Sequence, residues 1–370
     1  VRFVVYDYSE GIDYSKPTAY DDAITRINAD IIAGKMPDIM VVNSIPWRNY
    51  ADKGLLLDLG ARMAKDKSFD PSLYLTNSFD VMKQRDKLYT LSTAMSLSGI
   101  IADQAVVGDR TSWTVQDFQD LVNRQPDQKN VFYQMPGESI LNMLLMGNLD
   151  AFVDKTQGKA NFDSPEFIQL LEFAKKYGVP PDKMVNQEGD GLIPGEYVPP
   201  VFQTIWLSRF EDYATYNQQY EGRAVILGYP SPKQTGPMLQ ASAPLAVAAN
   251  SKNLDEIWEF LKFMLSPTIQ DQLITNYEGF PILRSSLEKA GAKAIVDTQK
   301  QWEDFQKQQQ QNGVLPADAA AKADSAIWGG VARVTQQDVD TIIGILTTAD
   351  SLLGYDEKAN QLIYEETGPF

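Results

Sequence analysis

The feature that most constrains the fold is a helix followed at once by a short apolar run near the start of the chain. Apolar side chains recur at helical spacing across residues 20–31, Thr18 can cap this helix, and Gly34 can end it. The apolar run 39–42 has the length of a buried strand, and the stretch 3–8 before the helix also has the pattern of a strand. Strand, helix and strand in this order predict a βαβ unit with a parallel pair, and therefore an α/β fold.

The rest of the chain alternates in a similar way. Local patterns predict strands at 88–102, 224–227 and 245–249, a strand and then a helix within 131–153, and helices that begin at 113 and 163, cover 206–220 and 254–265, and fill the chain after 281. Thr111 or Ser112 is expected to cap the helix near Trp113. The Gly/Pro-rich residues 186–200 are predicted to form a loop, and residues 230–242 a return crossing between lobes.

The chain is too long for one ordinary core. Its 370 residues predict two domains or two lobes, and a composition that is 44% hydrophobic and 22% charged is typical of a globular protein. The formal net charge of −16 disfavours nucleic acid and anionic membranes as partners. No apolar run in the sequence is long enough to span a bilayer.

Cysteine and histidine are both absent from the sequence. Their absence excludes disulfides, zinc–thiolate sites, cysteine nucleophiles and histidine-based triads, so an enzyme would depend on carboxylates, Lys, Tyr or Ser. We predict no cofactor and no metal site. The chain opens on residues 1–6, which have the pattern of a strand already under way, without an initiator Met or a signal peptide. We infer a trimmed N-terminus, with any export signal or lipid-bearing Cys upstream.

Six segments, in a fixed order over nearly the whole chain, carry a resemblance to a known family. They are residues 32–39 (IAGKMPDI), residues 50–56 (YADKGLL), Trp113 at a helix start, residues 228–230 (GYP), residues 251–266 (SKNLDEIWEFLKFMLS), and Phe280-Pro281 followed by Arg284. Together they resemble the extracellular solute-binding proteins of ABC importers, in the group that includes maltose-binding protein. The GYP segment resembles a subgroup found largely in Gram-positive bacteria. The sequence departs from the family at both ends, so we expect some ligand contacts to lie outside this chain.

The resemblance implies a two-lobed α/β fold of the type II periplasmic-binding-protein kind, with three crossings between the lobes. The first lobe would take residues 1–97 and 241–280, the second lobe residues 103–237 and 283–370, and the hinge segments would lie near 96–104, 236–243 and 279–286. Ligand would bind in the cleft, and closure of the hinge would present the closed form to a membrane permease.

The resemblance also implies the partners and the location of the protein. The expected ligand is a small molecule, a carbohydrate and more specifically an oligosaccharide, and the expected protein partners are the membrane subunits of an ABC permease. We expect an extracellular monomer, held at the cell surface as a lipoprotein by an anchor outside this chain.

Four candidate ligand contacts lie in the predicted first lobe and at its first crossing. Trp47 follows the strand 39–42 in a loop where the family places ligand contacts, and Asn43 and Ser44 belong to the same loop. An indole can stack on the C–H face of a sugar, whereas hydroxyls and amides can match its hydroxyl groups. Trp47 can equally anchor the loop, and the other two side chains can satisfy loop backbone. Ser96 falls where relatives place a polar contact, or is an ordinary hinge serine.

The other five candidates lie in the predicted second lobe. Glu138 and Ser139 follow Pro136-Gly137 at a predicted helix N-terminus, where an ordinary cap is the alternative. The family often places an aromatic platform near Trp206, and core packing is the rival interpretation. Arg209 can orient a hydroxyl or a carboxylate, or form a surface ion pair. Trp328, beside Gly329-Gly330, either reaches the cleft or packs on its own lobe.

The remaining aromatic side chains are predicted to be structural. Trp258 lies on the amphipathic helix 254–265 and Trp113 opens a helix, so both are expected in the core. Phe210, Tyr213 and Tyr220 are interpreted as one packed helical face.

Two other functions remain open from the sequence. A glycosidase with two catalytic carboxylates is chemically possible, because Asp and Glu total 49, although no pair has a motif context. A ligand-sensing receptor ectodomain would have the same fold as a transport protein, so the sequence does not separate these two.

Overall fold

The computed structural model shows an α/β protein. It describes residues 4–8, 10–13, 19–43, 45–126, 131–132, 134–154, 157–180, 183–184, 199–276, 279–313 and 332–353. The helices are α1 (Ala19–Ile32), α2 (Trp47–Asp52), α3 (Leu59–Lys65), the 3-10 turn η1 (Pro71–Leu73), α4 (Thr76–Val81), α5 (Gln104–Val107), α6 (Val115–Asn123), α7 (Gly137–Met146), α8 (Leu149–Phe152), α9 (Pro165–Tyr177), α10 (Phe210–Gln219), α11 (Leu254–Met264), α12 (Pro267–Asn276), α13 (Arg284–Gln311) and α15 (Gln336–Thr348). Among these described helices, none combines the length and the apolar character needed to cross a membrane.

The strands form two main sheets. They are β1 (Ile39–Val41), β2 (Lys83–Gln84), β3 (Lys87–Leu88), β4 (Thr90–Leu91), β5 (Ala94–Asp103), β6 (Val153–Asp154), β7 (Lys159–Ala160), β8 (Phe202–Leu207), β9 (Ala224–Leu227), β10 (Met238–Ser242), β11 (Leu245–Val247) and β12 (Phe280–Pro281). The first sheet has the order β1-β11-β4, and the second is built around β5, which pairs with β8, β9, β10 and β12. Two short hairpins, β2-β3 and β6-β7, complete the described strands.

The three predicted hinge segments lie side by side in the second sheet. β5, β10 and β12 are neighbours in the order β10-β5-β12, and all of their pairings are antiparallel. In the register, Gln240 opposes Ser96, and Phe280 opposes Met95. Segments more than 140 residues apart in the chain therefore meet along one strand.

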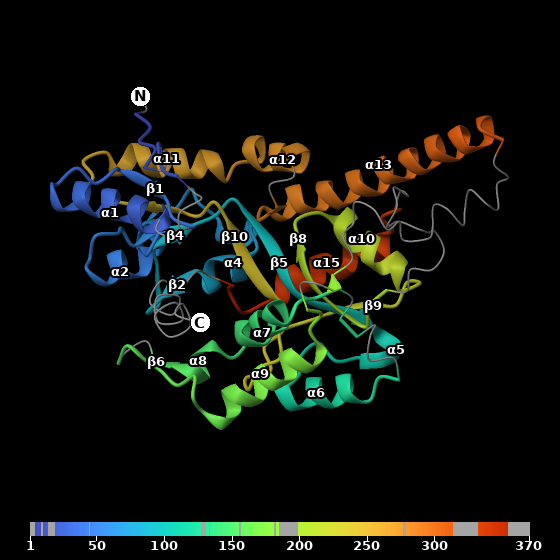
Figure 1. Cartoon of the computed structure of the whole chain (residues 1–370). Coiled ribbons are helices and arrows are strands. Elements are labelled where there is room, and N and C mark those ends of the chain that lie inside the picture. The colour runs from blue at the N-terminus through green and yellow to red at the C-terminus, as the bar shows by residue number, and fades with distance from the viewer. Residues whose placement is uncertain are drawn as a thin grey trace.

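Helices cover both faces of the second sheet. The first cluster of buried side chains comes from α3, α4, α10, α11, α13 and α15 and contains Met95, Leu97, Ile205, Phe210, Trp258, Phe280, Leu287 and Ile342. The second cluster comes from α6, α7, α8 and α9 and contains Ile100, Ala102, Phe118, Phe132, Ile140, Leu170, Phe202 and Leu227. Because side chains alternate along a strand, β5 contributes odd-numbered residues to the first cluster and even-numbered ones to the second. Figure 1 shows α11, α12 and α13 on one side of the strands and α6, α7 and α9 on the other.

The N-terminal part forms a third, separate cluster on the first sheet. Its members are Ile27, Met40, Val42, Trp47, Tyr50, Ala51, Leu56 and Ala246. The predicted helix and the strand after it are confirmed as α1 and β1, and Gly34, with φ +73°, follows the helix in the left-handed region.

The predicted parallel βαβ unit is wrong. β1 pairs with β11 in the antiparallel sense, and the described residues 4–8 form no strand; Val4 and Val5 are exposed. An apolar run can fit a strand locally, but it needs a neighbouring strand for its backbone groups, and none of the described strands borders β1 on its other side.

Three other local predictions also need correction. Val131 and Phe132 form a turn rather than a strand, and Trp206 lies in strand β8 rather than in the helix that follows it. The N-cap of α6 is Thr114, whose side chain forms a reciprocal capping box with Asp117. The predicted strand at 224–227 and the helix at 254–265 are confirmed as β9 and α11.

A polar network ties α11 to the end of α3. The Asp66 carboxylate accepts hydrogen bonds from Ser68 and from Trp258 Nε1, at 2.7 Å from the latter, and pairs with Lys262 Nζ at 2.9 Å. The hydrogen bonds from Ser68, followed by those from Trp258 and Lys262, hold the pKa of Asp66 well below its usual range.

This lowered pKa predicts a loss of stability in acid. A carboxyl group with a depressed folded-state pKa stabilises the fold above its unfolded pKa of about 3.9, and this contribution is lost as the pH falls toward the folded-state value. Urea unfolding at pH 6 and pH 3 should therefore show a smaller loss of stability for Asp66→Asn than for the wild type. An equal loss in the two proteins would contradict the assignment.

Candidate ligand-binding site

Polar side chains gather on one face of the second sheet, near the start of β5. Ser96 and Ser98 lie on the same face of β5, two residues apart. Gln240 opposes Ser96 on β10, whereas Trp206 and Met238 oppose Ser98 from the two flanking strands. Directly opposed residues of an antiparallel pair stand on the same face, so these five side chains share one surface, which we call the β5 face.

The β5 face continues the surface that the second cluster covers. Ile100 and Ala102, further along β5 on the same side, are buried beneath α6, α7 and α9. Trp206, in contrast, is 66% exposed although its strand neighbours Ile205 and Leu207 are buried in the first cluster or beside it. Ser96 and Ser98 are buried, at 2% and 4% exposure, so among the five side chains of the β5 face it is the Trp206 indole that presents a large uncovered surface.

Two polar groups of the β5 face lack protein partners. The Ser96 side chain is only 2% exposed, and its hydroxyl makes no hydrogen bond within the described residues. The half-buried Gln240 amide likewise has no side-chain hydrogen bond in those ranges. Both side chains are therefore able to form a hydrogen bond with a bound molecule or with water.

Beneath Trp206, two buried hydroxyls fix the strand. Ser98 Oγ lies 2.7 Å from the Tyr229 hydroxyl and donates to the carbonyl of Ile205 at 3.3 Å. That carbonyl belongs to the peptide bond that leads into Trp206. Burial raises the pKa of Tyr229, so its hydroxyl stays protonated at neutral pH and is available as a donor. No local pattern indicates this pair, because its two members are 131 residues apart in the chain.

Trp47 belongs to the third cluster, on the first sheet, rather than to the β5 face. Trp47 opens α2, is only 7% exposed, and packs in the third cluster with the Arg48 guanidinium 4.5 Å above its ring. Its indole therefore anchors the loop that follows β1 and presents little surface to a ligand. Asn43 is exposed directly after β1, and Ser44 lies outside the described residues.

Because Trp47 is buried, we expect Trp47→Ala to act on stability. Removing the ring should lower the free energy of unfolding by about 2 kcal/mol through lost apolar burial and the cavity left behind. Urea denaturation followed by circular dichroism measures this change. Trp206→Ala, at an exposed position, provides the comparison, and an unchanged midpoint for Trp47→Ala would show that this ring does not stabilise the fold.

Glu138 and Ser139 occupy the first turn of α7 and are exposed. Pro136, the N-cap residue of α7, makes no side-chain cap hydrogen bond. A close glycine contact fixes this end of the helix, because a Cβ on Gly178 would lie 2.4 Å from Gly137 Cα. The two predicted side chains are thus held on a rigid helix end that is open to a ligand.

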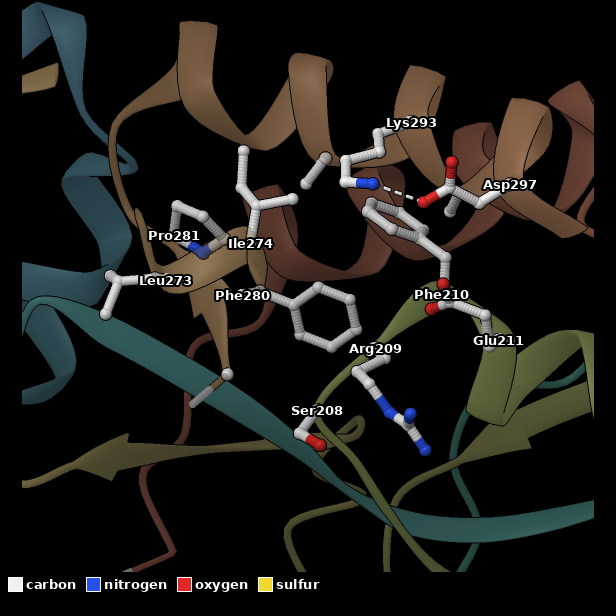
Figure 2. A pocket seen from close by; sticks show the side chains of 13 residues that line it. Ser208, Arg209, Phe210, Glu211, Leu273, Ile274, Phe280, Pro281, Lys293 and Asp297 are labelled. Atoms are coloured by element: carbon white, nitrogen blue, oxygen red, sulfur yellow. Dashed lines mark hydrogen bonds and ion pairs between the residues drawn. The ribbon is translucent and has the colours of Figure 1, made fainter. Parts of the chain in front are cut away.

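Arg209 lines a pocket between α10, α12, β12 and α13 (Figure 2). Its guanidinium pairs with Asp212 at 2.8 Å, as an ion pair within the N-terminal turn of α10. The pocket wall includes Phe280, which packs edge-on against Phe210 and belongs to the first cluster. Trp206 stands on the face of the second cluster, on the same side of the sheet as Ser96. The register therefore brings Ser96 and Trp206 to one face, whereas Arg209 lines the pocket beside Phe280; Trp328 lies outside the described residues.

The family of the chain follows from its sequence match. The model of the bacterial extracellular solute-binding proteins matches residues 12–297. The chain belongs to this family. The two-lobed α/β fold expected from the sequence is therefore the fold of this solute-binding protein, and its relatives are binding proteins of ABC transporters.

Solved structures of the same kind resemble this solute-binding protein at low sequence identity. A family 1 extracellular solute-binding protein from Alicyclobacillus acidocaldarius is 16% identical, with 95% of this chain and 84% of that chain covered and a TM-score of 0.49. The sugar-binding protein MalE from Xanthomonas citri is 16% identical, with 94% and 90% covered and a TM-score of 0.47. An ABC substrate-binding protein from Listeria monocytogenes in complex with cycloalternan is 17% identical, with 94% of this chain and 89% of that chain covered and a TM-score of 0.44. No curated protein sequence matches this one.

Proposed function

We propose that this solute-binding protein captures a carbohydrate, specifically an oligosaccharide, and delivers it to an ABC permease. The observation that carries the proposal is the β5 face, where an indole that is 66% exposed shares a surface with a hydroxyl and an amide that make no side-chain hydrogen bond within the described residues. A sugar offers a flat C–H face to an aromatic ring and a rim of hydroxyls to polar groups. Trp206 suits the first requirement, and Ser96 and Gln240 suit the second.

The proposal includes the division into lobes. The first lobe takes residues 1–97 and 241–280, the second takes residues 103–237 and 283–370, and the chain crosses between them three times. The adjacency of β5, β10 and β12 supports this division, because three strands that run side by side can bend together as one hinge. A ligand that contacts both lobes stabilises the closed form, which the permease then recognises.

Glu138 and Ser139 complete the proposed site from the second lobe. They stand at the uncapped start of α7, where exposed N–H groups and a carboxylate can both bind hydroxyls. Extracellular location agrees with the family, and we propose that the protein acts there as a monomer with a lipid anchor at the cell surface.

A ligand screen tests the proposal. The purified protein is heated with panels of linear and cyclic oligosaccharides, monosaccharides, peptides, polyamines and divalent metals, and every shift in melting temperature is followed by calorimetric titration. We expect stabilisation by at least one oligosaccharide. Stabilisation by peptides, polyamines or metals, with no response to any sugar, would overturn the carbohydrate assignment.

A further inference from the structure

Two buried polar side chains join the three neighbouring strands β5, β10 and β12 at the same end of the sheet. The first is Ser92, which precedes β5 and is fully buried. Its hydroxyl lies 2.7 Å from the carbonyl of Ala94 and 2.5 Å from the carbonyl of Ser242, the last residue of β10. A hydroxyl has one hydrogen to donate, so the two carbonyl acceptors share one bifurcated hydrogen bond or accept it alternately. Ser92 thus connects β5 and β10 by a bond that is not part of the ladder.

The second side chain is Gln270 of α12, which is also fully buried. Its Nε2 donates to the carbonyl of Thr93 at 2.9 Å, and its Oε1 accepts from the backbone N–H of Leu283 at 3.0 Å. Thr93 precedes β5 and Leu283 follows β12. One amide therefore joins the first and third segments, and its orientation is fixed because one partner is an acceptor and the other a donor.

The third segment also passes close to the other two. Gly279, just before β12, has φ +120°, a conformation that favours glycine. A Cβ at this position would lie 2.9 Å from Ser242 Oγ and 3.1 Å from the Met95 carbonyl. The three segments are therefore in contact here, with no room for a side chain between them.

These bonds lie one step along the ladder from the β5 face. Ala94 opposes Ser242, and the next pair on the same face is Ser96 and Gln240. Any change in the offset between β5 and β10 at Ser92 moves those two polar groups relative to each other. The side-chain bonds can therefore control the geometry of the proposed ligand contacts.

We propose that Ser92 and Gln270 form a polar clamp that fixes the resting arrangement of the three hinge strands and positions Ser96 and Gln240. This proposal rests on the proposed function only where it calls the three strands a hinge and treats Ser96 and Gln240 as ligand contacts. The clamp itself is a property of the ligand-free protein. Breaking either side-chain bond loosens the junction, so the lobes sample a wider range of angles.

Hydrogen exchange and small-angle X-ray scattering of the ligand-free protein test the clamp. Gln270→Met removes both bonds at nearly constant volume, and the amide of Leu283 should then exchange at least tenfold faster, while the amide of Leu287 in α13 stays as protected as before. Both Gln270→Met and Ser92→Ala should raise the radius of gyration. The matched control is Asn148→Leu, which removes buried hydrogen bonds to the carbonyls of Leu144 and Pro230, outside the three strands, and should leave both quantities unchanged.

The outcomes separate the clamp from the proposed function. An unchanged radius of gyration in Ser92→Ala and Gln270→Met overturns the clamp, even if exchange at Leu283 rises, because the bonds would then be local supports only. A larger radius supports the clamp whether or not any oligosaccharide binds. If Gln270→Met does not fold, Ser92→Ala decides by the same measurement, since it removes a single oxygen atom.

Discussion

Trp258→Ala is expected to lower the free energy of unfolding by about 3–5 kcal/mol, as is typical for truncating a large buried aromatic side chain. The indole of Trp258 is 2% exposed, packs edge-on against Phe69 at 5.7 Å, and donates to Asp66. Truncation therefore removes apolar contacts and one hydrogen bond to a carboxylate together. Urea denaturation followed by circular dichroism and by tryptophan fluorescence measures the change.

Two further variants separate these contributions. Trp258→Phe keeps most of the apolar contact but lacks the N–H donor to Asp66. Its free energy of unfolding should therefore fall by less than that of Trp258→Ala. A double variant with Asp66→Asn then reports the coupling between the two side chains. If Trp258→Ala abolished ligand binding at an unchanged melting temperature, the assignment of this side chain to the core would be wrong.

The second large effect is expected in binding. Trp206→Ala should weaken the affinity for the oligosaccharide identified in the screen by roughly 30- to 150-fold, or about 2–3 kcal/mol, the size found for aromatic residues at the centre of an interface. The physical reason is that the variant lacks the indole ring against which the C–H groups of the sugar would pack. Isothermal titration calorimetry measures the change.

Stability provides the control for this variant. Because Trp206 is exposed, Trp206→Ala should unfold at nearly the same urea concentration as the wild type. Trp206→Phe should recover part of the affinity, since a smaller aromatic face remains. A Trp206→Ala protein that binds the oligosaccharide as tightly as the wild type would remove this side chain from the site.

Local elements were predictable where the sequence carries its own signal. The amphipathic patterns of α1 and α11 and the apolar run of β9 need no knowledge of distant residues, and all three are present. Predictions from local spacing were wrong where pairing with a strand far away in the sequence determines the secondary structure. Trp206 has helical spacing with Phe210 and Tyr213, but pairing with Ser98 on β5 holds it in a strand. The parallel βαβ prediction failed for the same reason, because β11 occupies the neighbouring position in the sheet.

In the candidate site, too, some residues could be predicted from the sequence and others depend on pairing between distant strands. Ser96 and Trp206 were singled out from the sequence, and the antiparallel register brings them to one face. Gln240 and Tyr229 were missed, since only the pairing of strands far apart in the chain brings them near Ser96 and Ser98. Trp47 could not be sorted from the sequence, because a loop indole can face solvent or the core, and only its contacts with the third cluster decide.

The order of strands in the first sheet has a consequence for how the protein is made. β11, formed by residues that come late in the chain, is the middle strand, and it separates β1 from β4. During synthesis β1 and β4 therefore wait for their central partner until β11, about 150 residues after β4, has been assembled. The amino-terminal sheet closes by insertion of a late strand, so a nascent chain interrupted before β11 leaves β1 and β4 without their shared neighbour.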